Sequence, residues 1–222
     1  MRRRMSKRDF LGAVHQVVNG DARVRALLRA LRRTPVITYQ EETTPMTVEE
    51  FMTYAQKEAM EEPLSTNNAL RDTGSSAAKL NAQGTSTEVD IIPIECRPCT
   101  NNGPEGKARA LFGVFDNDEP QITLCTNRLH SAEDIREGLA HELTHTFDYC
   151  VRKFDFRQCN KLACSEIRAA REAECAGVWP EFFRRLCSKR KAKSATSNMF
   201  PNKAARAVDS AFEACYKDCQ PA

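Results

Sequence analysis

The sequence predicts an α+β fold, in which a β-hairpin leads into a helix and a second helix packs against that helix. Three stretches predict it: two β-prone runs around a turn at residues 110–125, an amphipathic helical pattern at 131–150, and an alanine-rich helical pattern at 162–170. No internal repeat is evident in the 222 residues. We therefore expect one domain over residues 91–222.

The hairpin is expected first along the chain. Its two runs, Ala110–Phe115 and Gln121–Cys125, are rich in β-branched, aromatic and other apolar residues. The segment between them, Asp116-Asn-Asp-Glu-Pro120, collects the residue types that favour turns. This order of apolar run, turn and apolar run predicts two antiparallel strands.

The first helix is expected from Ser131 to Cys150. Ser131 followed by Asp134 resembles a capping box, and Glu133 places a favourable negative charge in the first turn. The pattern contains no proline before Cys150. Apolar residues recur at helical spacing along it: Ile135, Leu139, Leu143 and Phe147.

This helix carries the pattern H-E-x-x-H, at His141-Glu-Leu-Thr-His145. Residues four apart lie on one face of a helix, so both imidazoles can reach a single ion, and zinc accepts that geometry. Glu142 would lie beside the ion, where its carboxylate can take a proton from water. The motif predicts a zinc site with Glu142 as general base.

A catalytic zinc needs a third protein ligand. The extended metzincin pattern fails, because Asp148 and Val151 stand where it requires glycine and histidine. The remaining histidines of the chain, His15 and His130, are of a kind more often found at surfaces than as ligands, although His130 stays an alternative.

A carboxylate is the better candidate for that ligand. Glu166 lies in the alanine-rich second helix, whose small side chains allow close packing against another helix. A glutamate supplied in this way is the gluzincin arrangement, so we expect a zincin-like, gluzincin-type domain. The alternative is that Glu166 is a solvated or ion-paired residue, in which case Glu172, Glu174 or His130 would be examined next. We expect Asp148 to hold an imidazole tautomer rather than to bind the metal.

Three features concern the peptide substrate of such a site. A strand beside the metal-binding helix is where a zinc protease commonly holds an extended peptide by backbone pairing. Gly138 weakens the helix by up to about 1 kcal/mol but leaves room one turn before the motif. Tyr149 is a candidate for an oxyanion donor.

These motifs resemble a known family. The stretches His141–Cys150 and Leu162–Ala170 are closely similar to the Atp twenty-three family, zinc metalloproteases and ATP synthase assembly factors of the mitochondrial intermembrane space. Further stretches share the resemblance: Cys96-Arg-Pro-Cys99, Gln121–Asn127, Ala207–Asp218 and, more loosely, Asn19–Leu28.

The resemblance implies zinc on His141 and His145, Glu142 as catalytic base and Glu166 as third ligand. It also implies a peripheral protein of the inner membrane that cuts a membrane-inserted precursor of an ATP synthase Fo subunit. A non-proteolytic assembly chaperone for Fo subunits is the alternative, and both roles can reside in one protein. An association with DNA repair, attached to some members, finds no support in the charge pattern.

Cysteine is abundant, and an even count suits disulfides in an oxidising compartment. A structural zinc site at Cys96-x-x-Cys99 is the competing interpretation, but it lacks a convincing second C-x-x-C pair. The C-x-x-x-C spacing of Cys215 and Cys219 would put both thiols on one helical face. We expect at least eight of the ten to be bonded: Cys96, Cys99, Cys125, Cys150, Cys159, Cys164, Cys175, Cys187, Cys215 and Cys219.

Residues 1–62 predict a basic N-terminal helical arm, with a break near Asn19-Gly-Asp21 and a further helix at 47–62. Its basic start is compatible with a presequence, with a contact to anionic lipid, or with a cationic helix docked on the core. Residues 63–90 are small and polar and predict a flexible linker. No run of about eighteen apolar residues is present, and a net charge of +3 does not indicate nucleic-acid binding.

Overall fold

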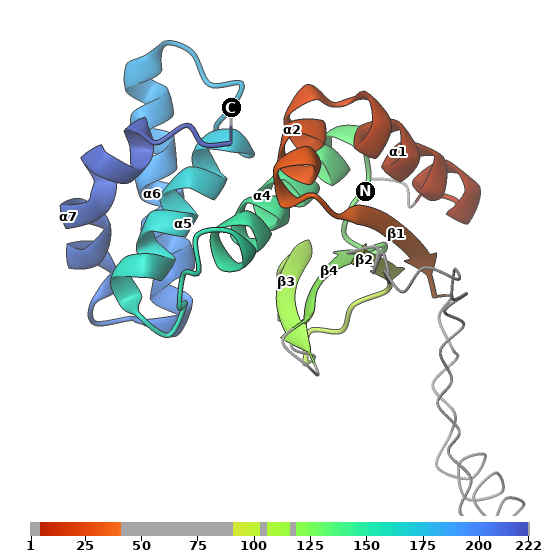
Figure 1. Cartoon of the computed structure of the whole chain (residues 1–222), viewed down its shortest axis with the longest axis horizontal. Helices are drawn as coiled ribbons and strands as arrows, with labels where there is room; N and C mark the ends of the chain where they lie inside the picture. Colours follow the sequence, from red (N-terminus) through yellow and green to blue (C-terminus); the bar gives the residue numbers. More distant parts are fainter. Residues whose placement is uncertain (1–4, 41–90, 103–105, 116–118, 222) are drawn as a thin grey trace, which may run out of the picture. The chain divides into compact units, whose positions relative to one another are not determined.

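Along the described part of the chain, two helices come before the strands of a short sheet and four helices follow them. A computed structural model describes residues 5–40, 91–102, 106–115 and 119–221. Its elements are α1 (Lys7–Gly20), α2 (Ala22–Leu31), β1 (Thr34–Tyr39), β2 (Ile91–Arg97), β3 (Ala110–Phe115), β4 (Glu119–Cys125), α4 (Ala132–Cys150), α5 (Cys159–Glu172), α6 (Glu181–Met199) and α7 (Ala204–Lys217). The mixed α+β class predicted from the sequence is confirmed (Figure 1).

The four strands form one sheet in the order β1-β2-β4-β3. Strands β3 and β4 pair antiparallel, so the predicted hairpin is present. Strands β1 and β2 were not predicted; β2 runs parallel to both β1 and β4. Among the described residues β3 therefore lies at one edge of the sheet, next to the motif-bearing helix α4.

Helix α4 begins and ends where the sequence predicts. The Ser131 Oγ accepts a hydrogen bond from the backbone N–H of Asp134 at 3.0 Å, which satisfies one of the free donors of the first turn. The helix packs on β3 and β4 and is covered by α1 and α2. Helices α1, α2 and α4 thus lie together on one side of the sheet (Figure 1).

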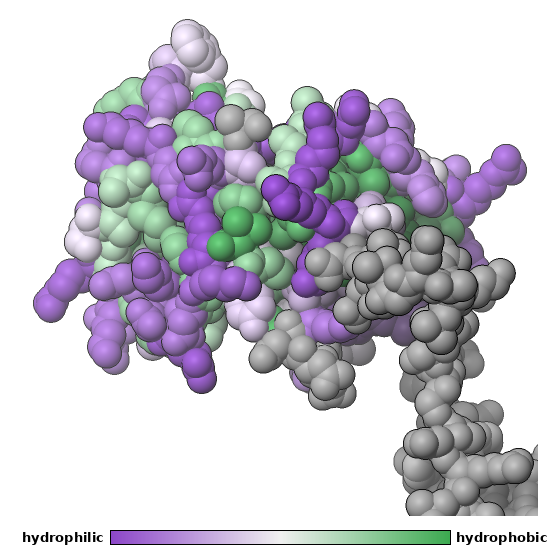
Figure 2. Space-filling model, viewed as in Figure 1, coloured by the Kyte–Doolittle hydropathy of each residue, from purple (hydrophilic) through white to green (hydrophobic). Residues whose placement is uncertain are grey.

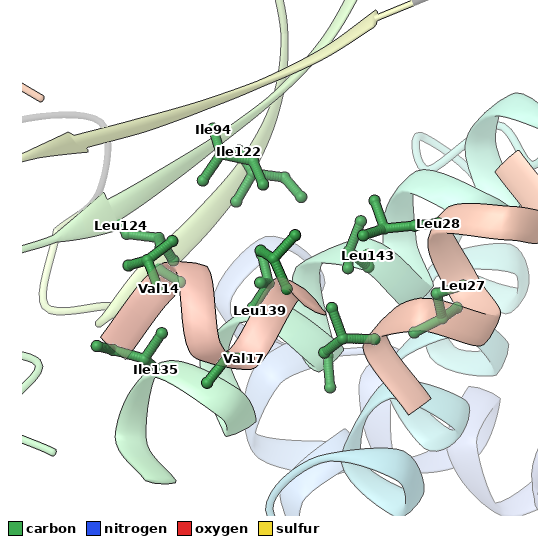
Figure 3. Close-up of a cluster of buried hydrophobic side chains, with 14 of the residues drawn as sticks. Val14, Val17, Leu27, Leu28, Ile94, Ile122, Leu124, Ile135, Leu139 and Leu143 are labelled. Atoms are coloured by element: carbon green, nitrogen blue, oxygen red, sulfur yellow. The ribbon is translucent and has the colours of Figure 1, made fainter. Parts of the chain in front are cut away.

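The main hydrophobic core fills the space between these elements. Figure 3 shows side chains from α1, α2, β2, β4 and α4 converging on it. The labelled residues are Val14, Val17, Leu27, Leu28, Ile94, Ile122, Leu124, Ile135, Leu139 and Leu143. This core includes the apolar faces of α1 and α2, and burial of those faces against α4 and the strands holds α4 in place.

The N-terminal helices are basic on their exposed faces and apolar on their buried faces. They meet at Asp21, whose side chain accepts a hydrogen bond from the N–H of Val24 at 2.8 Å and caps α2. The predicted break at this point is confirmed. The predicted helix at 47–62, the linker at 63–90 and the boundaries between these segments lie outside the described residues and stay predictions.

A second hydrophobic cluster joins α5, α6 and α7. Disulfide Cys164–Cys215 ties α5 to α7, and Cys175–Cys187 ties the loop after α5 to α6. Helix α5 extends the predicted second helix by a few residues at each end, whereas α6 was not predicted. Helix α5 also packs on α4, so the two clusters meet along the α4–α5 contact.

The expectation of at least eight bonded cysteines is wrong. Three disulfides form, the third being Cys99–Cys125, which leaves four thiols: Cys96, Cys150, Cys159 and Cys219. Cys99 pairs with Cys125 across the end of the sheet and is therefore unavailable to a structural zinc site with Cys96. Helix α7 ends at Lys217, so Cys219 does not share the helical face on which Cys215 meets Cys164.

The surface of the described part is mixed. In Figure 2 hydrophilic side chains cover much of the face shown, with smaller apolar patches between them. None of the described helices is long and apolar enough to span a bilayer.

Candidate metal centre

The two histidines of the motif and one glutamate of the second helix converge on a point. His141 and His145 lie one turn apart on α4, with their ring centroids 4.8 Å apart. Glu166 lies on α5, which approaches closely because Ala163, Ala169 and similar small residues are fully buried there. One ligand atom from each of the three residues lies within 4.8 Å of the others, the single such cluster among the residues described.

Hydrogen bonds orient the ring of His145. Its Nδ1 lies 2.8 Å from the Oγ of Ser165, and this hydroxyl donates its proton to the Oδ2 of Asp148 at 2.7 Å. A hydroxyl has one proton to give, so Nδ1 of His145 must be the donor in the other contact. The Nε2 lone pair is therefore left free and faces Glu166, 3.7 Å from its Oε1.

The ring of His141 is oriented in the same way by a carboxylate. Its Nδ1 lies 3.1 Å from the Oε2 of Glu174, which can only accept when ionised. Its Nε2 faces the Oε2 of Glu166 at 3.5 Å. Both imidazoles thus present the nitrogen and the tautomer that a metal ion requires.

The donor set fits a zinc ion. Tetrahedral bonds of about 2.0–2.1 Å place neighbouring ligand atoms roughly 3.4 Å apart. The Nε2 of His141 lies 3.5 Å from the Oε2 of Glu166, and the Nε2 of His145 lies 3.7 Å from its Oε1, so the carboxylate is within reach of an ion bound by both rings. The Oε2 of Glu166 is buried and has no hydrogen-bond partner within the described chain. A buried carboxylate oxygen is costly to leave in that state, so this atom favours a cation in front of it.

The charges of the site also favour a cation. Carboxylates of Glu142, Glu166 and Glu174 surround the two imidazoles. Burial lowers the pKa of His145 to about 4, whereas the carboxylates of Glu166 and Glu174 outweigh burial at His141 and raise its pKa. Burial opposes ionisation of Glu174, but its hydrogen bond with His141 prevails and lowers the pKa of Glu174 to about 2. The pocket is therefore acidic and suited to a divalent metal ion.

Glu142 is held beside this cluster by the neighbouring strand. Its Oε2 accepts a hydrogen bond from the backbone N–H of Phe112 on β3 at 2.7 Å. Burial raises the pKa of the Glu142 carboxyl to about 7, and the Phe112 N–H offsets part of that effect. Because Phe112 belongs to the edge strand of the described sheet, the carboxylate lies where this strand meets the cluster.

A cavity of about 180 Å³ opens next to these residues. His141, Glu142 and Glu174 line one part of it, and Gly138 lies at the point where α4 approaches β3. A Cβ at Gly138 would lie 3.3 Å from the Cβ of Ala110. The glycine therefore permits a close approach of helix and strand beside the candidate metal centre.

The other residues considered from the sequence lie elsewhere. His15 is exposed on α1, and His130 lies outside the metal cluster, with its backbone N–H bonded to Asp134. Glu172 pairs with Arg23 and Arg171 rather than with a histidine. Tyr149 packs with Phe112 and Phe156 and lines a separate cavity of about 420 Å³.

Sequence reasoning missed three groups at the site. It gave no part to Ser165 or to the backbone of Phe112, and it considered Glu174 only as a substitute ligand. Asp148, expected to hold an imidazole, reaches His145 through the Ser165 hydroxyl and also forms a buried ion pair with Arg168. No local pattern marks these contacts, because each joins α4 to a residue outside that helix.

Comparison with known proteins agrees with this arrangement. The family model described as the peptidase M76 family matches residues 56–222. The chain is 32% identical over 141 residues to the mitochondrial inner membrane protease ATP23 homolog of Homo sapiens, covering 58% of this chain and 54% of that protein. It is 32% identical over 161 residues to mitochondrial inner membrane protease ATP23 of Saccharomyces cerevisiae, covering 64% and 66%.

The chain thus spans between about half and two thirds of the length of these relatives. No solved structure matches it. The family match covers most of the chain and includes both helices of the candidate centre. The chain belongs to the peptidase M76 family.

Proposed function

We propose that the chain is a zinc-dependent endopeptidase with a gluzincin-type site. The observation that carries the proposal is the convergence of His141, His145 and Glu166 with Glu142 held beside them by Phe112. The family match and the relatives named as proteases support it. When bound, zinc supplies a Lewis acid that polarises a carbonyl and lowers the pKa of water to about 7.

The residues of the chain then have separate tasks. His141, His145 and Glu166 would hold the ion, and Ser165 and Glu174 would keep the two imidazoles in the tautomer that binds it. Glu142 takes a proton from the attacking water and passes it to the leaving amine. The bond to the Phe112 N–H fixes the carboxylate in place and leaves its other oxygen for that proton.

The edge of β3 is the proposed binding site for the substrate backbone. An edge strand can pair with an extended peptide as an additional strand. The hydrogen bond from β3 to Glu142 places this edge next to the metal cluster, so a peptide paired there would pass in front of it. Gly138 and the adjoining cavity leave room beside the peptide.

For the substrate we propose a membrane-inserted precursor of an ATP synthase Fo subunit, cut in the mitochondrial intermembrane space. Support comes from the resemblance described above and from relatives named as mitochondrial inner membrane proteases. The chain would associate peripherally with the inner membrane and also assist assembly of ATP synthase. A non-proteolytic chaperone for Fo subunits is the second candidate, but it would not require a base at Glu142.

The test is the variant Glu142→Gln in the full chain. Because Glu142 is not a ligand, the variant should keep its zinc, yet cleavage should fall by about 10²–10⁴-fold. The control Glu133→Gln changes an exposed carboxylate on the same helix and should affect neither. Zinc content by metal analysis and cleavage of the precursor would be measured together. Unimpaired cleavage by Glu142→Gln would refute the assignment of the base.

Glu142→Gln also distinguishes the protease from the non-proteolytic chaperone when it is expressed in cells that lack the endogenous protein. Accumulated precursor with normal ATP synthase assembly would show that assembly does not depend on proteolysis. Failure of assembly, as severe as in the absence of the protein, would show that cleavage is the required activity. Native gel electrophoresis of ATP synthase gives this readout.

A further inference from the structure

An exposed apolar cluster lies outside the metal centre, at the start of α6. Phe182, Phe183 and Leu186 are 64%, 54% and 50% exposed, and Trp179 in the preceding loop is 86% exposed. Single exposed apolar side chains are common at protein surfaces, but here four lie within eight residues. A contiguous apolar patch of this kind is typical of a site that contacts another protein or a membrane. We refer to Trp179, Phe182, Phe183 and Leu186 as the aromatic patch.

The patch faces away from the protein interior. Ser188, Ala192 and Thr196 recur every four residues and form the buried face of α6. Phe182 and Leu186 recur with the same spacing on the opposite side, and Arg190 continues their row one turn further on. Phe182 and Leu186 therefore lie on the side of α6 opposite its buried face.

The charge of α6 indicates which partner fits. Residues 182–199 contain six lysines and arginines and no acidic residue. Arg190 and Lys191 are exposed beyond the patch, whereas Lys189 and Lys193 pair with Asp209 on α7. Segments that anchor a protein at a membrane interface typically combine aromatic side chains, which enter the interface, with lysines and arginines, which contact lipid phosphates. The start of α6 has this composition.

The loop that carries Trp179 also borders the candidate metal centre. Glu174, which bonds His141, lies at its start, five residues before Trp179. Disulfide Cys175–Cys187 fastens the loop to α6 between these two points. Figure 1 shows this loop passing from the end of α5 to the start of α6. The patch and the metal centre are thus joined by a short, cross-linked segment.

We propose that the aromatic patch inserts into the interface of an anionic lipid bilayer, while Arg190 and Lys191 contact the lipid phosphates. This inference deepens the proposed function, because it identifies the surface through which the protein would meet the membrane that holds its substrate. It requires no helix that spans the bilayer. Insertion of the side chains removes apolar surface from water, and the two cations make binding dependent on anionic lipid and on salt.

The chain offers its own probe, since Trp179 is its single tryptophan. The full-length, zinc-loaded protein would be mixed with vesicles of phosphatidylcholine and cardiolipin, and separately with vesicles of phosphatidylcholine alone. We expect a blue shift of tryptophan emission, and quenching by lipids brominated in their acyl chains, with the anionic vesicles. Unchanged emission with anionic vesicles would overturn the proposal.

Variants distinguish the patch from general adhesion. Phe182→Ser with Phe183→Ser should lower vesicle partitioning at least about tenfold, because two apolar side chains are lost from the interface. Arg190→Gln with Lys191→Gln should lower it about tenfold on anionic vesicles and should reduce its dependence on salt. The matched control Met199→Ser removes an exposed apolar side chain at the far end of α6 and should change nothing.

Other outcomes would also decide the matter. If the double phenylalanine variant bound vesicles as well as the unchanged chain, or if Met199→Ser weakened binding equally, the patch would not be the anchor. If the patch variants changed the sedimentation coefficient of the protein but not its lipid binding, the patch would be a contact between copies, and the proposal would be wrong.

A soluble peptide substrate separates this proposal from the proposed function. The double phenylalanine variant and Met199→Ser should keep their zinc and cleave a water-soluble peptide normally, because none of these residues lies in the metal centre. Lipid binding without any cleavage would leave the anchor standing and refute the protease. Cleavage without lipid binding would refute the anchor alone.

Discussion

The Nδ1 of His141 and the Oε2 of Glu174 lie 3.1 Å apart, at the junction of α4 and the loop after α5. Glu174 is outside the metal cluster, and through this contact it holds the ring of His141, which is one of the candidate metal ligands. A carboxylate behind a histidine ligand fixes its tautomer and raises its basicity, and loss of such a partner typically weakens metal binding 10–100-fold.

Glu174→Ala should therefore bind zinc about 10–100-fold more weakly than the unchanged chain, with Glu174→Gln between the two. The amide of glutamine can still accept a hydrogen bond but has no charge. Competition with a chromophoric chelator would give the dissociation constants. Glu133→Ala, which removes an exposed carboxylate from α4, is the control and should keep full affinity. Equal affinities in all of these proteins would exclude Glu174 from the support of the site.

Ser165→Ala tests the corresponding contact at His145. The variant removes the acceptor of the Nδ1 proton, so we expect zinc affinity to fall about 10-fold or more. Ser188→Ala is a matched control, because the Ser188 hydroxyl is also buried but bonds the Arg184 carbonyl within α6. Each change should lower the free energy of unfolding by roughly 0.5–1.5 kcal/mol. A loss of zinc affinity as large in Ser188→Ala would mean that the effect is on stability and not on the site.

Gly138→Ala tests the close approach of α4 to β3. Alanine gains up to about 1 kcal/mol of helix propensity over glycine, but here its Cβ would lie 3.3 Å from the Cβ of Ala110. Helix and strand must shift apart, which moves the Phe112 N–H relative to Glu142. We expect little or no gain in stability and a lower kcat/KM for peptide cleavage.

Gly12→Ala is the control for this prediction. Gly12 lies within α1, and a Cβ there would meet no atom within 4 Å. This variant should gain up to about 1 kcal/mol in the free energy of unfolding and keep its activity. Urea unfolding and steady-state kinetics of both variants give the comparison. An equal gain in both, with activity unchanged, would show that the contact with Ala110 is easily relieved.

The parts of the fold that were predicted correctly have local signals. Ser131 caps α4 by accepting a hydrogen bond from the N–H of Asp134, only three residues further along the chain. His141 and His145 lie on one face because they are one helical turn apart. Strand β2 has no such signal, because Pro93 interrupts its pattern and its partners lie far away in the sequence. Its parallel pairing could not be read from neighbouring residues.

Helix α6 and the supports of the metal centre were missed for related reasons. The apolar residues at the start of α6 point outward, so the helix lacks the buried apolar face by which helices are recognised. Ser165 is one small residue in an alanine-rich helix, and only the packing of α5 on α4 shows that it faces His145. The ligands follow from spacing, whereas their hydrogen-bond partners follow from tertiary contacts.

The four thiols should differ in their reactivity. Cys96 is buried in the main core, and burial raises the pKa of its thiol to about 12, so little thiolate forms at neutral pH. Cys219 is exposed after the end of α7. Alkylation of the native protein, followed by peptide mass mapping, should label Cys219 first and Cys96 only after unfolding. Early labelling of Cys96, or fewer than four thiols in the unfolded and unreduced chain, would contradict the structure.

The last prediction concerns the C-terminal segment, which two arginines hold against α4 and α5. Arg152 and Arg168 both face the carboxylate of Asp218, and the Arg152 Nη2 donates to its Oδ1 at 2.8 Å. The hydrogen bond with Arg152 lowers the pKa of Asp218 in the folded chain. An aspartate with a lowered pKa stabilises the fold above its unfolded pKa of about 3.9, and the stabilisation is lost as pH falls through the folded value.

Asp218→Asn should therefore lower the free energy of unfolding at pH 7 by on the order of 1 kcal/mol. The difference between the two proteins should stay constant down to about pH 5 and shrink below about pH 4. Loss of metal at acidic pH affects both proteins equally and cancels in the difference. Asp155→Asn is the comparison: the pKa of Asp155 is also lowered by Arg157, but this pair is exposed and screened by solvent, so the same trend should appear with a smaller amplitude. A difference for Asp218→Asn that is independent of pH would mean that its ion pair with Arg152 does not stabilise the fold.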